Sequence, residues 1–233
     1  MSQIRQLVNS FCCGKDEEGI TVYRHICTRK QMREIKKFWY ITSINNLVSI
    51  FKRGILCRAE INKAEINKFE IPTTDISNRG VQKHRKGFHQ LVPLFFADNT
   101  PMLYIKMKEA SDAICLLEID KAVKDLDDVQ FSNGNVASQN TEIYNSLDSF
   151  TNEEEEIIFS RNPAYWNKWK RIRSAEVLVP IKVKPKFIKS IFVASEVSYV
   201  KVINLREQWD INMPKISINL TEKGISWIPK SCG

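Results

Sequence analysis

Residues 165–179 place a cationic, aromatic stretch directly before an apolar run. The first ten of these residues contain two tryptophans and four basic side chains, and Glu176 then opens a run that continues through Pro180 and Ile181. The pattern predicts a loop that leads into a buried strand. An unpaired carboxylate is costly to bury. We therefore expect Glu176 to be paired or functional, with an exposed place on an edge strand as the alternative.

Basic and acidic residues are separated along the chain. Residues 161–215 hold twelve Lys and Arg against four acids, whereas residues 125–160 hold nine acids and no Lys or Arg. The formal net charge of +8 favours a polyanionic partner such as a nucleic acid. The acidic run at 153–156 is typical of a solvated helix face or loop.

Composition excludes several classes of protein. With 233 residues and 43% hydrophobic residues, the chain can form one domain, or one domain with a decoration. No window reaches the ~18 apolar residues of a membrane helix, and no signal-like apolar core is present, so we expect a cytoplasmic protein without a membrane partner. The six cysteines have no Cys-x-x-Cys spacing and are expected to be reduced. The set Cys12, Cys13, His25 and Cys27 matches no common zinc spacing, so no metal is expected.

The order of elements predicts a mixed α+β domain with two packed sheets or a split barrel. Ser43 is predicted to cap a helix that ends at Gly54, and Thr100-Pro101 to begin another. The segment 58–90 is polar and irregular, as in lids and binding segments. A short helix is expected at 120–126, a further strand candidate at 199–209, and strand-like pieces without a partner after 210. Strands are predicted at 38–42, 91–97, 113–119, 176–183 and 187–194. We divide the chain into an extension (1–37), a main domain (38–209) and a tail (210–233).

The available side chains narrow the chemistry. Three histidines are present, none beside a Ser or Cys in a nucleophile turn, so triad hydrolysis is not expected. Neither a P-loop nor a Gly-x-Gly-x-x-Gly fingerprint occurs. One carboxylate, Glu176, and one arginine in the polar segment, Arg85, remain. Such a pair suits a reaction through an oxocarbenium-like ribose. Because its segment is polar, replacing Arg85 with Ala is expected to change stability by less than ~0.5 kcal/mol.

Four motifs, in order from about residue 38 to 200, resemble the DarT family, whose members are toxins that ADP-ribosylate nucleic acid. The opening Trp39-Tyr40-Ile41-Thr42-Ser43-Ile44-Asn45-Asn46-Leu47 is similar to the family's Tyr-His-Ile-Thr-x-Ile-x-Asn-Leu. The second is Val92-Pro93-Leu94-Phe95-Phe96-Ala97 with Thr100-Pro101-Met102-Leu103-Tyr104. Phe131-Ser132-Asn133-Gly134-Asn135 resembles Phe-x-x-Gly-His, and Arg173-Ser174-Ala175-Glu176-Val177-Leu178-Val179 resembles Arg-x-Ala-Glu-Phe-Leu-Val.

The resemblance implies an ADP-ribosyltransferase fold of two packed, mainly antiparallel sheets, with NAD as donor. It makes Glu176 the catalytic glutamate and Arg85 the catalytic arginine. The implied NAD-binding residues are Tyr40, Thr42, Asn46, Met102 and Asn135. The segment before the catalytic strand would read the substrate through Trp166, Trp169, Lys170, Arg171 and Arg173. A base stacked on either tryptophan contributes ~1–3 kcal/mol, and structural packing of the tryptophans is the alternative.

Two departures from the family pattern concern the acceptor. The family histidines of the first and third motifs are Tyr40 and Asn135 here. Both keep a hydrogen-bonding side chain but lose an imidazole. We expect a toxin of a toxin–antitoxin or phage-defence system that modifies a base in single-stranded DNA or RNA, DNA being favoured, and that has an antitoxin partner. A non-catalytic basic nucleic-acid-binding module and a protein-modifying transferase are the competing hypotheses.

Overall fold

A computed structural model describes residues 12–15, 21–24, 34–66, 74, 76, 85–162, 169–221 and 224–225. The chain divides into two units, Met1–Gln31 and Met32–Gly233. In the first unit, β1 (Cys12–Lys15) and β2 (Thr21–Arg24) form an antiparallel pair. The second unit begins earlier than the expected residue 38, because Ile35 is already buried in its core. The rest of the description concerns this second unit.

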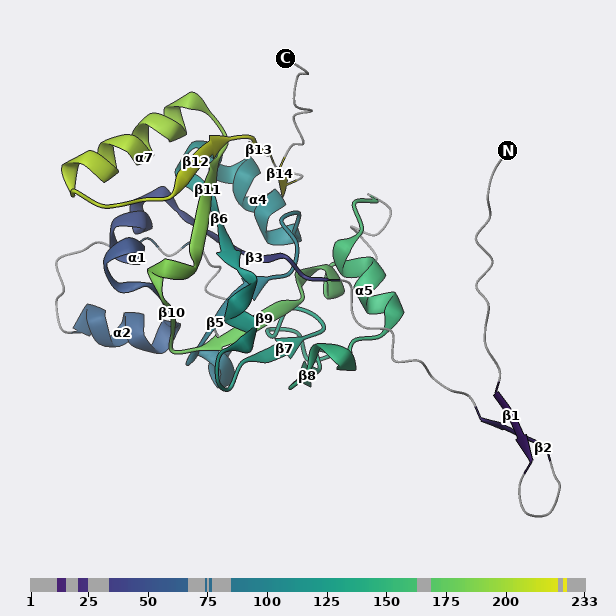
Figure 1. The fold of residues 1–233 in the computed structure, drawn as a ribbon. Helices are drawn as coiled ribbons and strands as arrows, with labels where there is room; N and C mark the ends of the chain where they lie inside the picture. Colours follow the sequence, from purple (N-terminus) through teal and green to yellow (C-terminus); the bar gives the residue numbers. More distant parts are fainter. Residues whose placement is uncertain are drawn as a thin grey trace, which may run out of the picture. The chain divides into compact units, whose positions relative to one another are not determined.

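The second unit is built on an eight-stranded sheet with the order β12-β11-β6-β3-β5-β9-β7-β8 (Figure 1). Every neighbouring pair is antiparallel except β11 with β12, which is parallel. In sheet order, the strands are β12 (Lys215–Ile218), β11 (Ile188–Val193), β6 (Ile114–Asp120), β3 (Lys37–Ser43), β5 (Leu91–Phe95), β9 (Glu176–Pro180), β7 (Gln130–Ser132) and β8 (Ile143–Tyr144).

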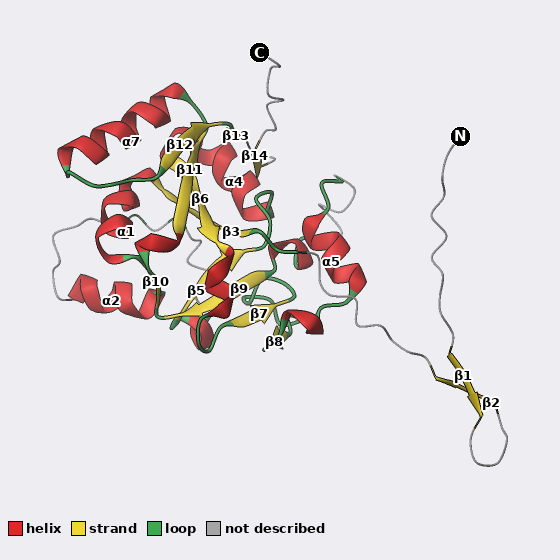
Figure 2. Ribbon diagram, in the orientation of Figure 1, coloured by secondary structure: helices red, strands yellow, loops and turns green. Residues whose placement is uncertain are grey.

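The sheet is nearly divided between β3 and β5. These two strands share one residue pair, Trp39 with Phe95, whereas β3 and β6 pair over their whole length. Pro93 lies in the stretch of β5 that does not pair with β3, and it has no N–H to donate to a ladder. We call β12, β11, β6 and β3 the first half-sheet, and β5, β9, β7 and β8 the second (Figure 2). The predicted α+β class is confirmed, with two joined halves in place of two separate sheets.

Short helices surround the sheet, and their ends follow the predicted signals. Ser43 caps a 3-10 turn that leads into α1 (Leu47–Arg53), and Gly54 ends α1 with φ of +96°. A side chain at Gly54 would lie 2.6 Å from the Val183 carbonyl oxygen, so glycine is required for space as well. The Thr100 hydroxyl accepts from Leu103 N–H at the start of α4 (Pro101–Ala110). The other helices are α2 (Arg58–Ile66), α5 (Asn152–Phe159) and α7 (Glu196–Gln208).

Three elements differ from the sequence predictions. The polar segment begins with α2, whose charged and apolar residues have little helical periodicity. The strand candidate at 199–209 is wrong, because residues 199–208 belong to α7, another helix with a weak pattern. After residue 210, β12 joins the main sheet beside β11, so this part is not a separate tail. In addition, the strand expected at 176–183 is broken: β9 ends at Pro180, and after Ile181, whose φ is +62°, β10 (Lys182–Val183) pairs with β4 (Ile55–Leu56) outside the main sheet.

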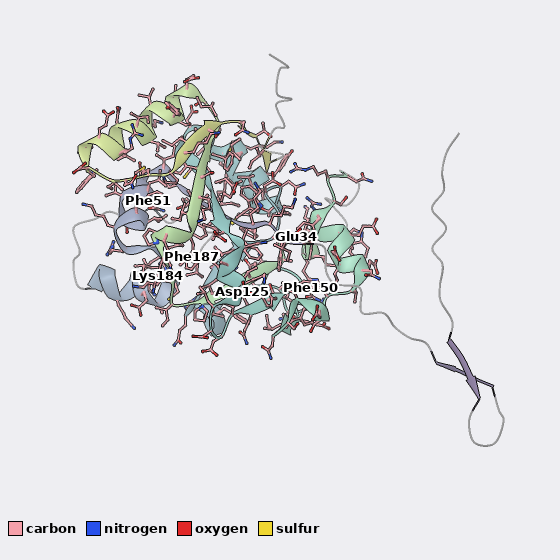
Figure 3. All side chains as sticks on the ribbon, in the orientation of Figure 1. Glu34, Phe51, Asp125, Phe150, Lys184 and Phe187 are labelled. Atoms are coloured by element: carbon pink, nitrogen blue, oxygen red, sulfur yellow. The ribbon has the colours of Figure 1, made fainter. Side chains whose placement is uncertain are left out.

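Aromatic rings join α5 and the second half-sheet to the core. Phe96, immediately after β5, makes edge contacts with Phe38 at 5.6 Å and with Phe150 at 5.5 Å between ring centroids. The ring of Phe150, which Figure 3 labels, also meets Tyr144 of β8 at 5.0 Å between ring centroids. Edge-to-face pairs of this kind contribute ~0.5–1.5 kcal/mol beyond their burial. Among the described helices, none is long and apolar enough to cross a membrane.

Candidate active site

One row of paired residues crosses the sheet at the point where its halves meet. Trp39 of β3 pairs with Phe95 of β5, Phe95 pairs with Glu176 of β9, and Glu176 pairs with Ser132 of β7. Glu176 is the first residue of its strand. The row therefore places the predicted catalytic carboxylate at the level where β3 and β5 separate.

A cavity of about 640 Å³ lies where the halves separate. Its walls include residues 40–42 of β3 on one side and Leu91, Pro93 and Phe95 of β5 on the other. Residues of α1, β4, the start of α2 and the exposed side of α4 continue the lining. This volume is in the range of small-molecule and cofactor sites, roughly 300–1,000 Å³. The divergence of two strands thus provides room for a ligand the size of a dinucleotide.

Glu176 and Arg85 form a bidentate ion pair in the cavity wall. Arg85 Nη1 donates to Glu176 Oε1 at 2.9 Å, and Nη2 donates to Oε2 at 3.1 Å. The glutamate side chain is 2% exposed and the arginine side chain 16%. Two parallel N–H···O bonds give this pair both strength and a defined orientation. The expectation that Glu176 is paired is confirmed, and its partner lies 91 residues away along the chain.

The two oxygens of Glu176 are not equivalent. Oε2 accepts a second bond from the Val136 N–H at 3.2 Å, whereas Arg85 is the donor to Oε1 in the described part of the chain. The Glu176 backbone N–H is held by the Ser132 hydroxyl at 3.1 Å. Each carboxylate oxygen can accept about two bonds. Oε1 therefore keeps the acceptor capacity that a substrate hydroxyl needs.

The five predicted NAD-binding residues all line this cavity, although their role stays a prediction. They are Tyr40, Thr42, Asn46, Met102 and Asn135. The Asn46 amide is used within the protein: it donates to Thr42 Oγ1 at 3.0 Å and exchanges bonds of 2.8 and 2.6 Å with the backbone of Thr74. Asn135 lies beside the ion pair, with Oδ1 3.5 Å from Arg85 Nη1.

The predicted substrate-reading residues do not share one environment. Lys170 and Arg171 line the cavity, and Trp169 packs against the main hydrophobic core. Trp166 lies outside the described residues. Arg173 requires a correction, because it is 1% exposed and therefore not available to a substrate. Its guanidinium donates to the carbonyls of Ile157, Ser160 and Asn99, so it ties the end of α5 to the loop before α4.

The pairing of Arg85 also changes an expectation about stability. A polar segment predicted a surface arginine whose loss would have little effect. Its guanidinium instead compensates a carboxylate that is almost fully buried. Removing one partner of a buried pair leaves an uncompensated charge and typically costs ~3–5 kcal/mol. The value of ~0.5 kcal/mol is therefore too small for this position.

Sequence reasoning missed other residues that shape the site. Ser132 and Val136 hold Glu176, and Arg53 and Arg58 line the cavity from α1 and α2. Ser132 lies within the third motif, which indicated this part of the chain. The motif did not predict the hydrogen bond between Ser132 and the Glu176 N–H. Within the described ranges, no three His, Cys, Asp or Glu residues gather in a way that could hold a metal ion. The expectation of no metal stays a prediction.

A family model and a curated protein are similar to this chain. A family model described as ssDNA thymidine ADP-ribosyltransferase, DarT, matches residues 39–224. A DNA ADP-ribosyl transferase–DNA ADP-ribosyl glycohydrolase fusion protein of Thermosipho africanus (strain H17ap60334) is 29% identical over 171 residues, which cover 68% of this chain and 42% of that protein. The chain thus spans less than half the length of this curated relative.

Solved structures show the same fold. Thermus sp. 2.9 DarT in complex with ADP-ribosylated ssDNA has a TM-score of 0.65 at 20% identity, with 81% of this chain and 96% of that chain covered. The complex of the same protein with NAD+ has a TM-score of 0.60 at 21% identity, covering 81% and 97%. Thermosipho africanus DarTG in complex with ADP-ribose has a TM-score of 0.63 at 23% identity, covering 79% and 50%. The expected ADP-ribosyltransferase fold is confirmed.

Proposed function

The chain belongs to the DarT family of ssDNA thymidine ADP-ribosyltransferases, and we propose that it transfers ADP-ribose from NAD to thymidine in single-stranded DNA. The observation that carries this proposal is the bidentate pair of Glu176 and Arg85 in the wall of the cavity. The family model includes both the segment around Arg85 and the strand of Glu176. The cavity volume of about 640 Å³ is sufficient for a dinucleotide donor.

The chemistry follows from the two Glu176 oxygens. Cleavage of the nicotinamide–ribose bond releases neutral nicotinamide with the bonding electrons and leaves positive charge on the ribose. A fixed carboxylate stabilises that charge without reorganisation at the moment of reaction. We assign the ribose hydroxyl contact to Oε1, because Oε2 already accepts from Arg85 and Val136. Arg85 holds the carboxylate in this orientation through its two bonds, while the second lone pair of Oε1 accepts from the hydroxyl.

The acceptor step requires an unpaired base. A ring nitrogen of thymine forms the new bond to ribose C1, and its proton passes to solvent. This nitrogen is engaged in base pairing in a duplex. Flipping a paired base costs a few kcal/mol that a single strand does not require. Single-stranded DNA is therefore the proposed substrate. RNA is the weaker candidate, since the family description names DNA.

The biological setting is proposed from the relative with a second activity. The Thermosipho africanus protein joins a DNA ADP-ribosyl transferase to a DNA ADP-ribosyl glycohydrolase. A glycohydrolase removes what a transferase adds, so the two form a toxin and its antidote. We assign the present chain the toxin role, in the cytoplasm, with an ADP-ribosyl glycohydrolase as antitoxin and phage defence as a use.

The test offers NAD labelled in its ADP-ribose to four matched oligonucleotides: single-stranded DNA with and without thymidine, single-stranded RNA, and duplex DNA. Label on thymidine-containing single-stranded DNA, with an added mass of one ADP-ribose, is the expected result. Equal label on duplex DNA would contradict the single-strand requirement, and label on RNA alone would move the target to transcripts. Absence of nicotinamide release with every nucleic acid would favour a binding module.

A further inference from the structure

Arg171 wraps around the turn that follows β7. Its Nη1 donates to Asn133 Oδ1 at 2.9 Å and to the Asn133 carbonyl at 3.4 Å. Its own carbonyl accepts from Asn135 N–H at 3.2 Å. Gly134 between them has no room for a side chain, because a Cβ would lie 2.8 Å from Arg171 Cγ. The arginine is therefore fixed against the turn by side-chain and backbone contacts while it lines the cavity.

Asn133 is itself held in one orientation. It is 4% exposed, and its Nδ2 donates to Glu154 Oε1 at 2.6 Å and to Tyr144 OH at 3.2 Å. A carboxylate only accepts, so the amide nitrogen must face Glu154. The amide oxygen consequently faces two donors, Arg171 Nη1 and Glu142 N–H.

The acidic helix α5 supplies the end of this network. Glu154 Oε2 accepts from the Thr151 N–H in the capping box of α5, and its Oε1 accepts from Asn133. One member of the acidic run at 153–156 thus makes hydrogen bonds within the protein. Helix α5 also lies against the turn Ile172–Ser174 that follows Arg171 (Figure 1). Helix α5 thus contacts both Asn133, which bonds Arg171, and the turn that follows Arg171.

The cavity has cations at two walls. Arg53 and Arg58, both half-buried, lie on the α1–α2 wall, while exposed Lys170 and half-buried Arg171 lie on the wall before β9. A dinucleotide donor carries one diphosphate. A DNA strand continues past the site at both ends, so its phosphates need cations on an open wall. Among the described residues, the side-chain bonds that Arg171 makes to Asn133 leave from Nη1, so Nη2 and Nε keep donors for a substrate oxygen.

We propose that Arg171 contacts a backbone phosphate of the acceptor strand, and that Asn133 is the positioning residue that holds its guanidinium for this contact. The proposal rests on the proposed function, and it adds the residue that locates the strand. Phosphate contacts of this kind set the register of a strand without reading its bases. Arginine suits the role because its planar fork can bond Asn133 and a phosphate at once.

The first experiment measures steady-state transfer for Arg171→Gln, with Lys201→Gln as the matched charge change on α7. Arg171→Gln should raise the oligonucleotide KM about tenfold, as for loss of one charge-assisted bond. Because Arg171 also lines the cavity, the KM for NAD can change as well, but it should rise less than the oligonucleotide KM. The slope of log K against log salt should become shallower by about 0.7 in Arg171→Gln, the value for one phosphate on a single strand. Lys201→Gln should change neither oligonucleotide KM nor slope.

The second experiment is a double-mutant cycle that separates positioning from general stability. Asn133→Ala should raise the oligonucleotide KM severalfold in the wild-type background and leave it unchanged in the Arg171→Gln background, because both changes remove the same contact. A merely structural Asn133 would add its effect in both backgrounds.

A double variant that moves the negative charge from position 154 to position 133 covers the case in which Asn133→Ala does not fold. Asn133→Asp with Glu154→Gln exchanges donor and acceptor in their mutual bond but keeps an oxygen toward Arg171. This double variant should have an oligonucleotide KM near wild type, and a tenfold increase would overturn the positioning role. If Arg171→Gln raised the KM for NAD and left the KM for the oligonucleotide unchanged, the phosphate contact would be overturned. Failure of the wild-type protein to transfer at all would instead refute the proposed function.

Discussion

The two half-sheets each carry a glutamate on a central strand, and the two glutamates have opposite surroundings. Glu118 of β6, in the first half-sheet, is 21% exposed and pairs with Lys37 of neighbouring β3 at 2.9 Å. Glu176 of β9, in the second, is 2% exposed and pairs with Arg85 from outside the sheet. The first pair lies at the surface, where an ion pair contributes ~0–1 kcal/mol. In the proposed mechanism, the second half-sheet maintains this buried charge for the reaction, and the first half-sheet is a scaffold.

Glu176→Gln should break this contrast most strongly. The amide keeps the volume of the side chain but removes the charge that stabilises the ribosyl cation, so transfer should fall ~10²-fold or more. Glu118→Gln is the same chemical change in the first half-sheet and should leave transfer within about twofold. Transfer rates with labelled NAD measure both. Near-full activity of Glu176→Gln would mean that another carboxylate performs the chemistry.

Arg85→Ala should affect both activity and stability. It leaves Glu176 buried with one remaining donor to its carboxylate in the described part of the chain, the Val136 N–H. The free energy of unfolding should drop by ~3 kcal/mol, the lower end for a broken buried pair, because Arg85 is itself partly exposed. Chemical denaturation measures the drop. The double variant Arg85→Ala/Glu176→Gln should regain part of this stability but no activity, and an equal loss in the double variant would contradict the charge explanation.

Gly134→Ala should test how tightly the turn of the second half-sheet is packed. Its Cβ would approach Arg171 Cγ at 2.8 Å and the Arg171 carbonyl oxygen at 2.9 Å, so backbone must move. Overpacking of this kind costs ~1–3 kcal/mol. Gly87→Ala is the matched control, since no atom lies within 4 Å of its Cβ. Thermal unfolding that is unchanged for Gly134→Ala would show that the turn is adaptable.

Ser195→Ala should produce the smallest effect, a small loss of stability on the side of the first half-sheet without a loss of activity. Ser195 caps α7 by accepting from the Ser198 N–H at 3.2 Å, and such caps contribute ~1 kcal/mol. The melting temperature should fall by ~2–4 °C. Transfer activity should be unchanged, because α7 packs on the first half-sheet side and does not line the cavity. A marked loss of transfer would show that the two halves are coupled.

The same variant has a pH signature. The Ser195 hydroxyl donates to Asp112 Oδ1 at 2.6 Å and is the main cause that lowers the pKa of this carboxyl. A lowered folded-state pKa stabilises the fold at neutral pH, and this contribution is lost as pH falls through that pKa. Ser195→Ala should raise the Asp112 pKa toward its ordinary value, measurable by NMR titration. The stability difference between variant and wild type should then narrow in acid.

Local signals predicted the elements that a few neighbouring residues specify. Strand 37–43 follows from its aromatic and β-branched residues, and the ends of α1 and α4 follow from Ser43, Gly54 and Thr100. The weakly patterned helices α2 and α7 were not predicted, because their apolar residues do not repeat at helical spacing and packing alone selects the helix.

The sequence by itself determined the family motifs, the identity of Glu176 and Arg85 as the candidate pair, and the cationic stretch before β9. Only the tertiary structure decided which partner each charged side chain has. Glu176 and Arg85 are 91 residues apart, and their bidentate bond depends on a sheet register that no local pattern encodes. Arg171 and Arg173, two positions apart in one basic run, face the cavity and the interior respectively. A charge pattern in the sequence gives the number and order of charged residues. The burial of each side chain, and its partner, depend on which distant segments of the backbone fold against it.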